Sequence, residues 1–199
     1  MDSKRILKVP FSKDEIAQLK AGDYVYLTGA IYSARDAAHK RLYESIIQSG
    51  EDHMNGTMLY DRNIIPMDIT GNVFYYLGPT PAREGQVIGS AGPTTSSRMD
   101  KYTPLLLEKG LVGMIGKGKR SKAVIDSIVK NGAVYFAAVG GAGALLSKCI
   151  KESEVIAYDD LGTEAIRKMR VEDFPVVVVI DSQGNNLYET AVEEYRNSL

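Results

Sequence analysis

Segments with strand-like spacing alternate with helix-like segments along almost the whole of this 199-residue chain, and this alternation limits its possible folds. Strand-like runs at residues 24–28, 73–77 and 133–139 are separated by helical patterns and turns. The pattern is typical of an α/β domain in which helices pack on a sheet. Residues 176–180 are apolar on both faces, which predicts a strand in the sheet interior. No repeat or linker interrupts the pattern, so we expect residues 1–199 to form one domain.

Capping residues predict where several helices begin. Ser12, followed three residues later by Glu15, forms a capping-box pattern and predicts a short helix. Ser33 is expected to cap a longer helix, and residues 164–169 are expected to form a short one. Residues 51–63 are polar and lack a clear period, which indicates a loop or an insertion.

Charge and cysteine content exclude several functions. The formal net charge of −1 argues against a general nucleic-acid binder. No apolar run approaches the roughly 20 residues that span a bilayer, and the N-terminus lacks a signal-peptide core. We therefore expect a soluble cytoplasmic protein. The single cysteine, Cys149, allows neither an internal disulfide nor a multi-cysteine metal site, and His39 and His53 do not make up the deficit. Chemistry that needs a metal must take it from elsewhere.

The first candidate for ligand binding follows the strand at residues 24–28. We expect Gly29 to turn the chain and Arg35 to lie in the first turn of the next helix, where free N–H groups attract anions. The planar fork of Arg35 suits a carboxylate, and His39, four residues on, shares its face. The alternative is a surface pair of Arg35 with Asp36 and a histidine satisfied by its neighbours.

Two further segments carry cations or hydroxyl groups. Residues 89–100 combine glycines, four consecutive hydroxyl residues and Arg98, which suits a carboxylate or phosphate cradle; a Ser/Thr-rich capping turn is the alternative. Lys117 follows a predicted strand, at a position where ligands of open α/β sheets bind; a solvated basic turn is the ordinary alternative. The glycines at residues 140–143 lack a full dinucleotide fingerprint, so close packing of helix on strand explains them better.

Together these segments are far more specific than any one of them. TGAIYSARDAAHKRL, YYLGPTP, GSAGPTTSSRMDKYT, MIGKG and VYFAAVGGAGALL resemble, in order and separation, the β region of class I fumarases and L-tartrate dehydratases. The resemblance runs from about residue 20 to 190. It implies a three-layer swivelling β/β/α domain, a variety of the α/β class. It also implies a hydro-lyase reaction, the reversible addition of water to a small dicarboxylic acid.

The resemblance also implies roles for individual residues. Arg35 and Arg98 resemble the ligands of the substrate carboxylates, and Lys117 a further cationic contact. Thr94 resembles the base that takes a proton from the carbon next to a carboxylate, and Thr95 a residue that hydrogen-bonds the substrate. Guanidinium groups would stabilise the negative charge that this proton removal builds. A threonine hydroxyl is a poor base unless neighbouring cations lower its pKa.

His39 belongs to the same motif as Arg35, and our hypothesis for it is that it orients Arg35 or serves as a capping partner. In the family, three cysteines of an α-type region hold a 4Fe–4S cluster. The resemblance therefore predicts an α-subunit partner in a hetero-oligomer, no metal ligands in this chain, and no activity without the partner. Fumarate is the first candidate substrate and L-tartrate the second. A non-catalytic anion-binding or regulatory module is the alternative of another class.

Overall fold

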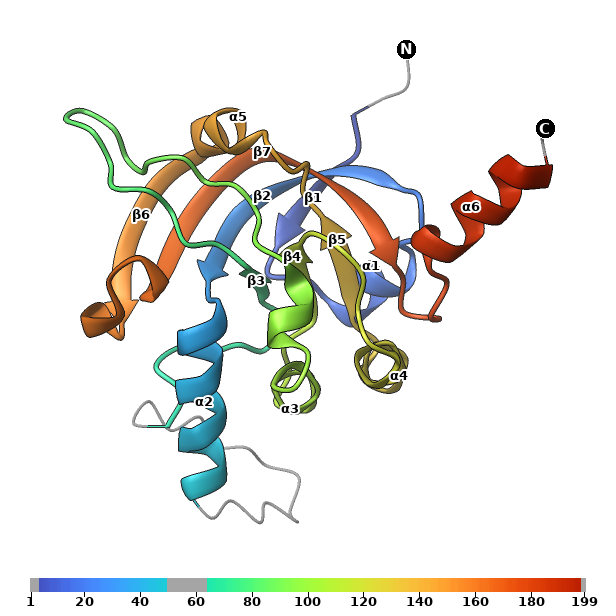
Figure 1. The fold of residues 1–199 in the computed structure, drawn as a ribbon, viewed down its shortest axis with the longest axis horizontal. Helices are drawn as coiled ribbons and strands as arrows, with labels where there is room; N and C mark the ends of the chain where they lie inside the picture. Colours follow the sequence, from blue (N-terminus) through green and yellow to red (C-terminus); the bar gives the residue numbers. More distant parts are fainter. Residues whose placement is uncertain (1–3, 50–63, 198–199) are drawn as a thin grey trace.

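The computed structural model describes residues 4–49 and 64–197, so the predicted loop at residues 51–63 lies outside the described part. The elements, in chain order, are β1 (Ile6–Val9), α1 (Lys13–Ala17), β2 (Tyr24–Ser33), α2 (Asp36–Gln48), β3 (Val73–Tyr75), η1 (Ser96–Met99), α3 (Thr103–Glu108), β4 (Gly113–Gly116), α4 (Lys122–Asn131), β5 (Val134–Ala137), α5 (Gly143–Cys149), β6 (Ile150–Ala157), η2 (Asp159–Glu164), β7 (Ile166–Ile180) and α6 (Leu187–Asn197). The α/β class is confirmed (Figure 1).

Two long strands close the sheet into a small barrel. β2 pairs in parallel with β1 and β3 and, antiparallel over most of its length, with β7. β3, β4 and β5 pair in parallel, and β5 pairs antiparallel with the C-terminal part of β7. The ring β2–β3–β4–β5–β7 is thereby complete, while β1 and β6 extend it on the outside. Alternation alone predicted the strands but not this closure.

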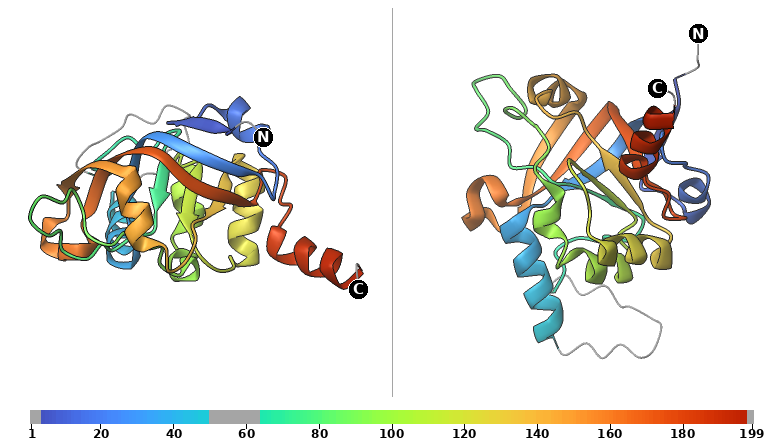
Figure 2. Two further views of the ribbon diagram at one scale, coloured as in Figure 1. Left: turned by 90° about the horizontal axis from the view of Figure 1, so that it is seen from above. Right: turned by 45° about the vertical axis from the view of Figure 1, so that its right-hand side comes forward.

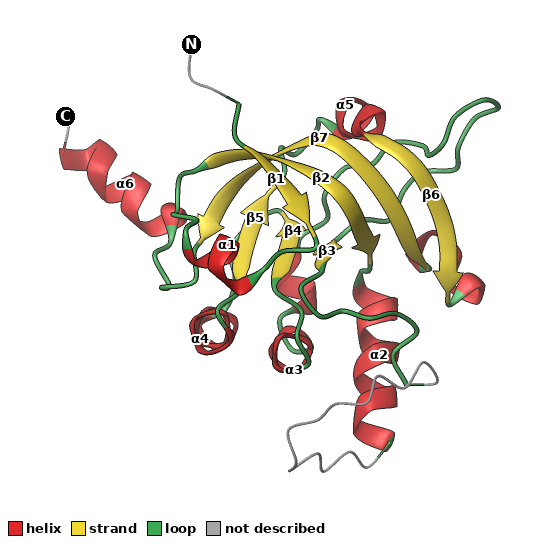
Figure 3. Cartoon of the chain, turned by 180° about the vertical axis from the view of Figure 1, so that it is seen from behind, coloured by secondary structure: helices red, strands yellow, loops and turns green. Residues whose placement is uncertain are grey.

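Alternate residues of the parallel strands face two separate cores, as the two-residue period of a strand requires. Val73 and Phe136 belong to the core enclosed by the strands. Phe74 and Tyr135, one residue away, belong to the core that the sheet forms with α2, α3 and α4. These three helices cover one face, while α5 lies against β6 and β7 (Figures 1 and 2). The C-terminal helix α6 extends away from the sheet (Figure 3).

The helix start predicted at Ser12 is confirmed. Ser12 and Glu15 form both hydrogen bonds of a capping box at the start of α1. Ser121 is the N-cap of α4, and Gly132 ends that helix in the left-handed conformation, with φ of 65°. In the described part of the chain, no helix is long and apolar enough to cross a membrane.

Two local predictions are wrong. Gly29 does not end its strand: β2 continues to Ser33, with a shift of register between Leu27 and Gly29. A Cβ atom at Gly29 would lie 2.2 Å from the Val9 carbonyl oxygen, so the glycine permits the close approach of β1. Ser33 is consequently a buried strand residue, and the N-cap of α2 is Arg35, without a side-chain cap.

The helix predicted at residues 164–169 is also wrong, because β7 begins at Ile166. This segment is rich in good helix formers, but β2 and β6 pair with it on its two edges. Hydrogen bonding to two neighbouring strands overrides the local helix propensity. β1, η1 and α6 were not predicted from the sequence.

Candidate functional site

Arg35 lies where β2 gives way to α2, with 21% of its side chain exposed. Its Nη2 atom lies 3.3 Å from Asp36 Oδ2 and 3.3 Å from Glu164 Oε1. A Cβ atom at Gly78 would lie 2.7 Å from Arg35 Nη1, so the glycine of the YYLGPTP motif makes room for the guanidinium. Arg35 Nε is buried without a hydrogen-bond partner in the described structure. The arginine is thus positioned by its neighbours but not saturated by them.

Arg98 reaches the same carboxylate from a different part of the chain. It lies on η1, more than half exposed, and its Nη1 atom is 3.4 Å from Asp36 Oδ2. The structure therefore brings Arg35 and Arg98 together around one carboxylate. The alternative of an Arg35–Asp36 surface pair also describes the contact, but it does not account for the convergence of a second arginine. Two guanidinium groups already share an anion at this point.

Thr94, Thr95 and Lys117 meet through their backbones. Thr95 and Lys117 form an isolated parallel bridge, in which the Lys117 N–H donates to the Thr94 carbonyl (3.2 Å) and the Ser96 N–H to the Lys117 carbonyl (2.9 Å). Thr94 is half-buried, whereas the other two predicted residues are exposed. Thr95 is also the N-cap of η1, the turn that carries Arg98. The hydroxyl residues, Lys117 and Arg98 therefore belong to one connected piece of backbone.

Thr94, Thr95 and Lys117 are connected to Arg98 through the backbone alone. Within the described residues, no side-chain hydrogen bond or ion pair joins Thr94 or Lys117 to Arg35 or Arg98. The site is an open surface between the start of α2, the turn at η1 and the loop after β4. The contacts of Arg35 with Glu164 and of Arg98 with Asp36 could not be predicted from the sequence, because they join elements far apart in the chain.

The glycines at residues 140–143 border this surface. A Cβ atom at Gly143 would lie 2.4 Å from Ser90 Oγ and 2.9 Å from the Gly92 nitrogen. The Gly143 carbonyl accepts a hydrogen bond from the Ala91 N–H, at 3.0 Å. These contacts join Gly143 to the loop at residues 90–92. The prediction that the glycines allow a helix to pack on a strand is therefore wrong about what they contact. The tight approach holds the GSAG segment in place.

His39 is completely buried on α2, beneath Arg35. Its Nδ1 atom is 3.1 Å from the Arg35 carbonyl oxygen, and since a carbonyl only accepts, Nδ1 carries the proton. Phe74, Tyr76 and Tyr102 surround the ring, and Nε2 has no hydrogen-bond partner among the described residues. Burial lowers the pKa of His39 to about 4, so the imidazole is neutral near pH 7. It contacts the backbone of Arg35 and lies away from solvent.

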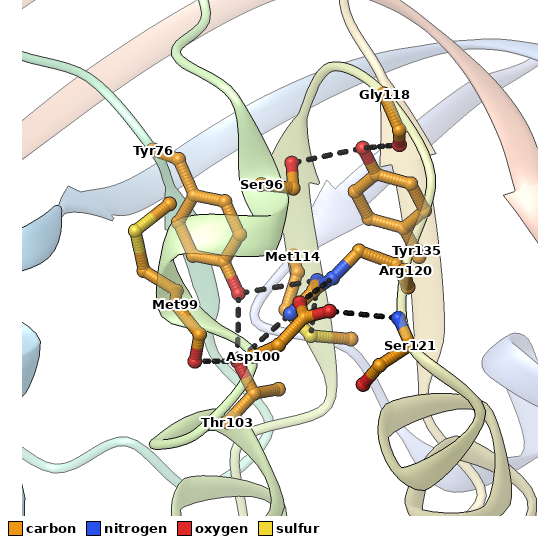
Figure 4. Close-up of polar contacts among 10 residues, drawn as sticks. All are labelled: Tyr76, Ser96, Met99, Asp100, Thr103, Met114, Gly118, Arg120, Ser121 and Tyr135. Carbon is orange, nitrogen blue, oxygen red and sulfur yellow. Dashed lines mark hydrogen bonds and ion pairs between the residues drawn. The ribbon is translucent and has the colours of Figure 1, made fainter.

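A buried polar network lies beside the site and was not anticipated (Figure 4). Arg120, whose side chain is completely buried, donates from Nε to Asp100 Oδ1 (2.7 Å) and from Nη2 to Thr103 Oγ1 (2.8 Å). Its Nη1 atom lies 3.4 Å from the Tyr76 hydroxyl. Burial alone would lower the pKa of Arg120, but the oxygens of Tyr76 and Asp100 raise it above its usual value, so the guanidinium stays charged.

A second branch of the network runs through Tyr135. The Tyr135 hydroxyl lies 2.9 Å from Ser96 Oγ and donates to the Gly118 carbonyl at 2.9 Å. The sequence treats residues 115–120 as a basic turn, which describes Lys117 and Lys119 but not Arg120. The available signal was the position of Asp100 and Arg120 shortly before Thr103–Pro104 and Ser121, residue types that often begin helices. Such spacing is common and does not by itself indicate an ion pair.

The donor set of this chain does not fit an iron–sulfur cluster. Cys149 is its only cysteine, and within the described residues no group of three or more His, Cys, Asp or Glu side chains could hold a metal ion. Cys149 is only half-buried, and its Sγ lies 3.7 Å from the Asp173 carbonyl oxygen. Burial raises the pKa of this thiol, which disfavours the thiolate that a metal needs.

Comparison with known proteins gives a consistent result. The family model described as "Fumarase C-terminus" matches residues 2–191. The chain is 37% identical over 182 residues to "Fumarate hydratase class I, anaerobic" of Escherichia coli (strain K12), covering 90% of this chain and 31% of that protein. It is 37% identical to "Fumarate hydratase 2" of Leishmania major over 186 residues, covering 92% and 30%.

A third relative is close to this chain in length. "Putative L(+)-tartrate dehydratase subunit beta" of Methanocaldococcus jannaschii is 34% identical over 184 residues, which cover 89% of this chain and 88% of that protein. The chain thus spans just under a third of the two fumarate hydratases but most of this subunit.

Proposed function

Because the chain belongs to the fumarase C-terminus family, we propose that it is the β subunit of a hydro-lyase that hydrates fumarate reversibly to L-malate. The observation that carries this proposal is the convergence of Arg35 and Arg98 on one carboxylate. Planar guanidinium groups bind carboxylates through paired hydrogen bonds, and a dicarboxylic acid offers the same group as Asp36. The contacts to Asp36 are long and partly exposed, so an incoming carboxylate can replace them.

The neighbouring residues supply the remaining polar contacts. We assign Lys117 as a further cation, Thr95 as a hydrogen-bonding residue and Thr94 as the group that accepts the proton from the carbon next to a carboxylate. Removing that proton places negative charge on the carboxylate, and fixed cations aimed at it stabilise the transition state. A threonine can accept a proton only if nearby cations lower the pKa of its hydroxyl. Lys117 and Arg98, on the same connected backbone, are the available cations.

His39 is assigned a positioning role. Its Nδ1–H and its own backbone N–H both donate to the Arg35 carbonyl, at 3.1 and 2.8 Å. A neutral, buried imidazole packed against three aromatic rings fixes this carbonyl and, with it, the direction in which Arg35 leaves the backbone. This arrangement supports the orienting hypothesis.

The cofactor is proposed to belong to a partner. A 4Fe–4S cluster would bind the substrate hydroxyl group and one carboxylate, and we place it on an α subunit because this chain lacks the cysteines. The name of the Methanocaldococcus relative as a subunit β supports a two-chain arrangement. We further propose a cytoplasmic location and assign the fold to the three-layer swivelling β/β/α class. Its support is the pair of cores on the two faces of β3–β5.

L-Tartrate is the second candidate substrate, because a relative of nearly the same length carries that name. Both acids are four-carbon dicarboxylates and require the same cationic contacts. They differ in hydroxyl groups, and a site that hydrogen-bonds a hydroxyl group discriminates strongly against its absence.

The test is anaerobic dehydratase activity on both acids, with this chain alone and after co-expression with a candidate α subunit and cluster reconstitution. We expect activity only in the complex. Arg98→Gln should lower kcat/KM in the complex by about 100-fold, since it removes a charged contact to the substrate. Arg5→Gln is the matched control: Arg5 is also partly exposed and paired with one aspartate, Asp23, at 2.6 Å. A well-formed complex with an intact cluster but no activity on either acid would refute the proposal.

A further inference from the structure

We propose that the buried Asp100–Arg120 pair positions the proposed site, because it fixes the segment carrying Thr94 and Arg98 against the loop carrying Lys117. Arg120 is a positioning residue in this proposal, since its side chain is fully buried and acts through Asp100. The inference rests on the proposed function for its effect on catalysis. The structural part, which concerns the two backbone segments, can be tested without any activity.

Asp100 ties the end of η1 to the start of α4. Its Oδ1 accepts from Arg120 Nε at 2.7 Å, and its Oδ2 accepts from the Ser121 backbone N–H at 2.7 Å. Both oxygens of one carboxylate are therefore bound by the loop that follows β4 (Figure 4). Asp100 lies two residues after Arg98, and Arg120 lies three residues after Lys117. The contact is thus made between the backbones that carry the two cations.

A second tie holds the other end of η1. Ser96 Oγ lies 2.9 Å from the Tyr135 hydroxyl, which donates to the carbonyl of Gly118. Gly116 permits this approach, since a Cβ atom there would lie 2.0 Å from Ser96 Oγ. Arg98 lies between the two ties, so both ends of its short turn are fixed to the loop that carries Lys117.

The ion pair also connects to the first turn of α3. Arg120 Nη2 donates to Thr103 Oγ1 at 2.8 Å, and this hydroxyl donates to the Met99 carbonyl at 2.9 Å. Arg120 further lies over the Tyr76 and Tyr135 rings, at 5.3 and 5.1 Å from their centroids. Each nitrogen of the guanidinium group therefore has a partner, and the orientation of the fork is determined.

Stability alone does not explain this arrangement. An apolar pair of similar volume usually serves a protein core as well as a buried ion pair. The helices that follow the two tied segments, α3 and α4, are also joined at the surface by Glu108 and Lys130, at 2.8 Å. The buried pair also fixes the relative orientation of the two segments. A planar guanidinium bound on three sides can do this, whereas a lysine or an apolar side chain cannot.

The test compares two double variants. Arg120→Met/Asp100→Asn removes both buried charges while leaving an acceptor for Ser121, and Lys130→Met/Glu108→Gln removes the surface pair between α3 and α4. Amide hydrogen exchange of the isolated chain is measured for residues 94–100 and 117–121. We expect exchange to be about ten-fold faster in the first variant, since local opening becomes easier. The surface control should leave the rate unchanged.

Catalysis provides the second readout, in the complex with the α subunit. The buried double variant should lose about ten-fold or more in kcat with a smaller change in KM, because misplacement of contacting groups mainly affects the transition state. Arg120→Lys keeps the charge but not the fork, so it should preserve folding and fail to restore kcat. It also serves as the test variant if the double variant does not fold.

Exchange rates and kcat that match those of the surface control would overturn the proposal. Faster exchange in residues 94–100 together with lost kcat supports it. If the complex of the unaltered chain is inactive on both acids, the proposed function fails, while the exchange experiment still decides whether the pair fixes these segments.

Discussion

Arg120 Nε lies 2.7 Å from Asp100 Oδ1, and no part of the arginine side chain is exposed. Arg98 Nη1, in contrast, lies 3.4 Å from Asp36 Oδ2, and 54% of the Arg98 side chain is exposed. The buried guanidinium has a partner for every nitrogen. The exposed contact shares one carboxylate oxygen with Arg35 and leaves other atoms without partners. The first contact is buried and fully paired, whereas the second is accessible to solvent, and we propose that a ligand carboxylate can replace Asp36 there.

Buried polar atoms without hydrogen-bond partners also distinguish the Asp36 contact from the Asp100–Arg120 contact. Within the described residues, three of the five buried side-chain atoms without a hydrogen-bond partner are Arg35 Nε, Asp36 Oδ1 and His39 Nε2. Buried polar groups are nearly always paired, so such a concentration needs an explanation. We propose that a ligand carboxylate partners Arg35 Nε and a ligand hydroxyl group partners Asp36 Oδ1, whereas His39 Nε2 is enclosed by aromatic rings. Arg120 needs none, which separates the two arginine sites without any reference to relatives.

The largest change in the free energy of unfolding is expected for Arg120→Met. The substitution leaves Asp100 inside the protein without its cation, and loss of one partner of a buried pair costs about 3–5 kcal/mol. Urea unfolding of the isolated chain measures this. Adding Asp100→Asn should recover most of the loss. A loss below about 1 kcal/mol, the range of surface pairs, would remove the distinction between the two sites.

The pH dependence of stability is expected to reveal His39. Burial lowers its pKa to about 4 in the folded chain, whereas an unfolded histidine titrates near 6.5. The unfolded chain therefore binds a proton first as the pH falls. The stabilisation is fully present above about pH 6.5 and is lost as the pH decreases towards 4, by about 3 kcal/mol.

The measurement is the free energy of unfolding between pH 7 and pH 4, for the unaltered chain and for His39→Gln. Asp36, Arg120, the other carboxylates and His53 are common to both, so their difference isolates the imidazole. The two curves should converge towards low pH. Parallel curves would show that His39 does not carry a lowered pKa.

Features formed by residues close together in the chain could be predicted, whereas features formed by distant residues could not. The capping box of Ser12 and Glu15 and the left-handed Gly132 are determined by a few adjacent residues, and both were predictable. The pairing of β2 with β7 joins distant segments, and it turned an expected helix at residues 164–169 into a strand.

The candidate site shows the same limit. Its cations stand in recognisable motifs, so their identities could be given before their positions. The burial of Arg120 could not be predicted. A guanidinium in a basic turn faces inward only if a buried carboxylate is placed to pair with it. That carboxylate, Asp100, lies at the end of η1, 20 residues earlier in the chain.

An intermediate effect is expected for Gly116→Ala. The added Cβ atom would lie 2.0 Å from Ser96 Oγ and 2.9 Å from Tyr76 Cδ2, and such overpacking costs about 1–3 kcal/mol. Gly140→Ala is the control, since the nearest atom to its Cβ is 3.8 Å away. Thermal unfolding of both variants compares the losses. Equal losses would mean that the Ser96 tie contributes little to holding η1.

The smallest change in stability, and the sharpest test of exchangeability, is expected for Asp36→Asn. Contacts of 3.3 and 3.4 Å at a partly exposed carboxylate contribute at most about 1 kcal/mol, so the free energy of unfolding should hardly change. Arg98 would then lose its neutralising carboxylate and Arg35 would keep only Glu164, so KM for the dicarboxylate should fall in the complex. Asp126→Asn, which removes another exposed pair, with Lys122, should alter neither quantity. If Asp36→Asn instead destabilises the chain as much as Arg120→Met does, Asp36 is a structural partner of both arginines. The carboxylate between them would then not mark where a substrate binds.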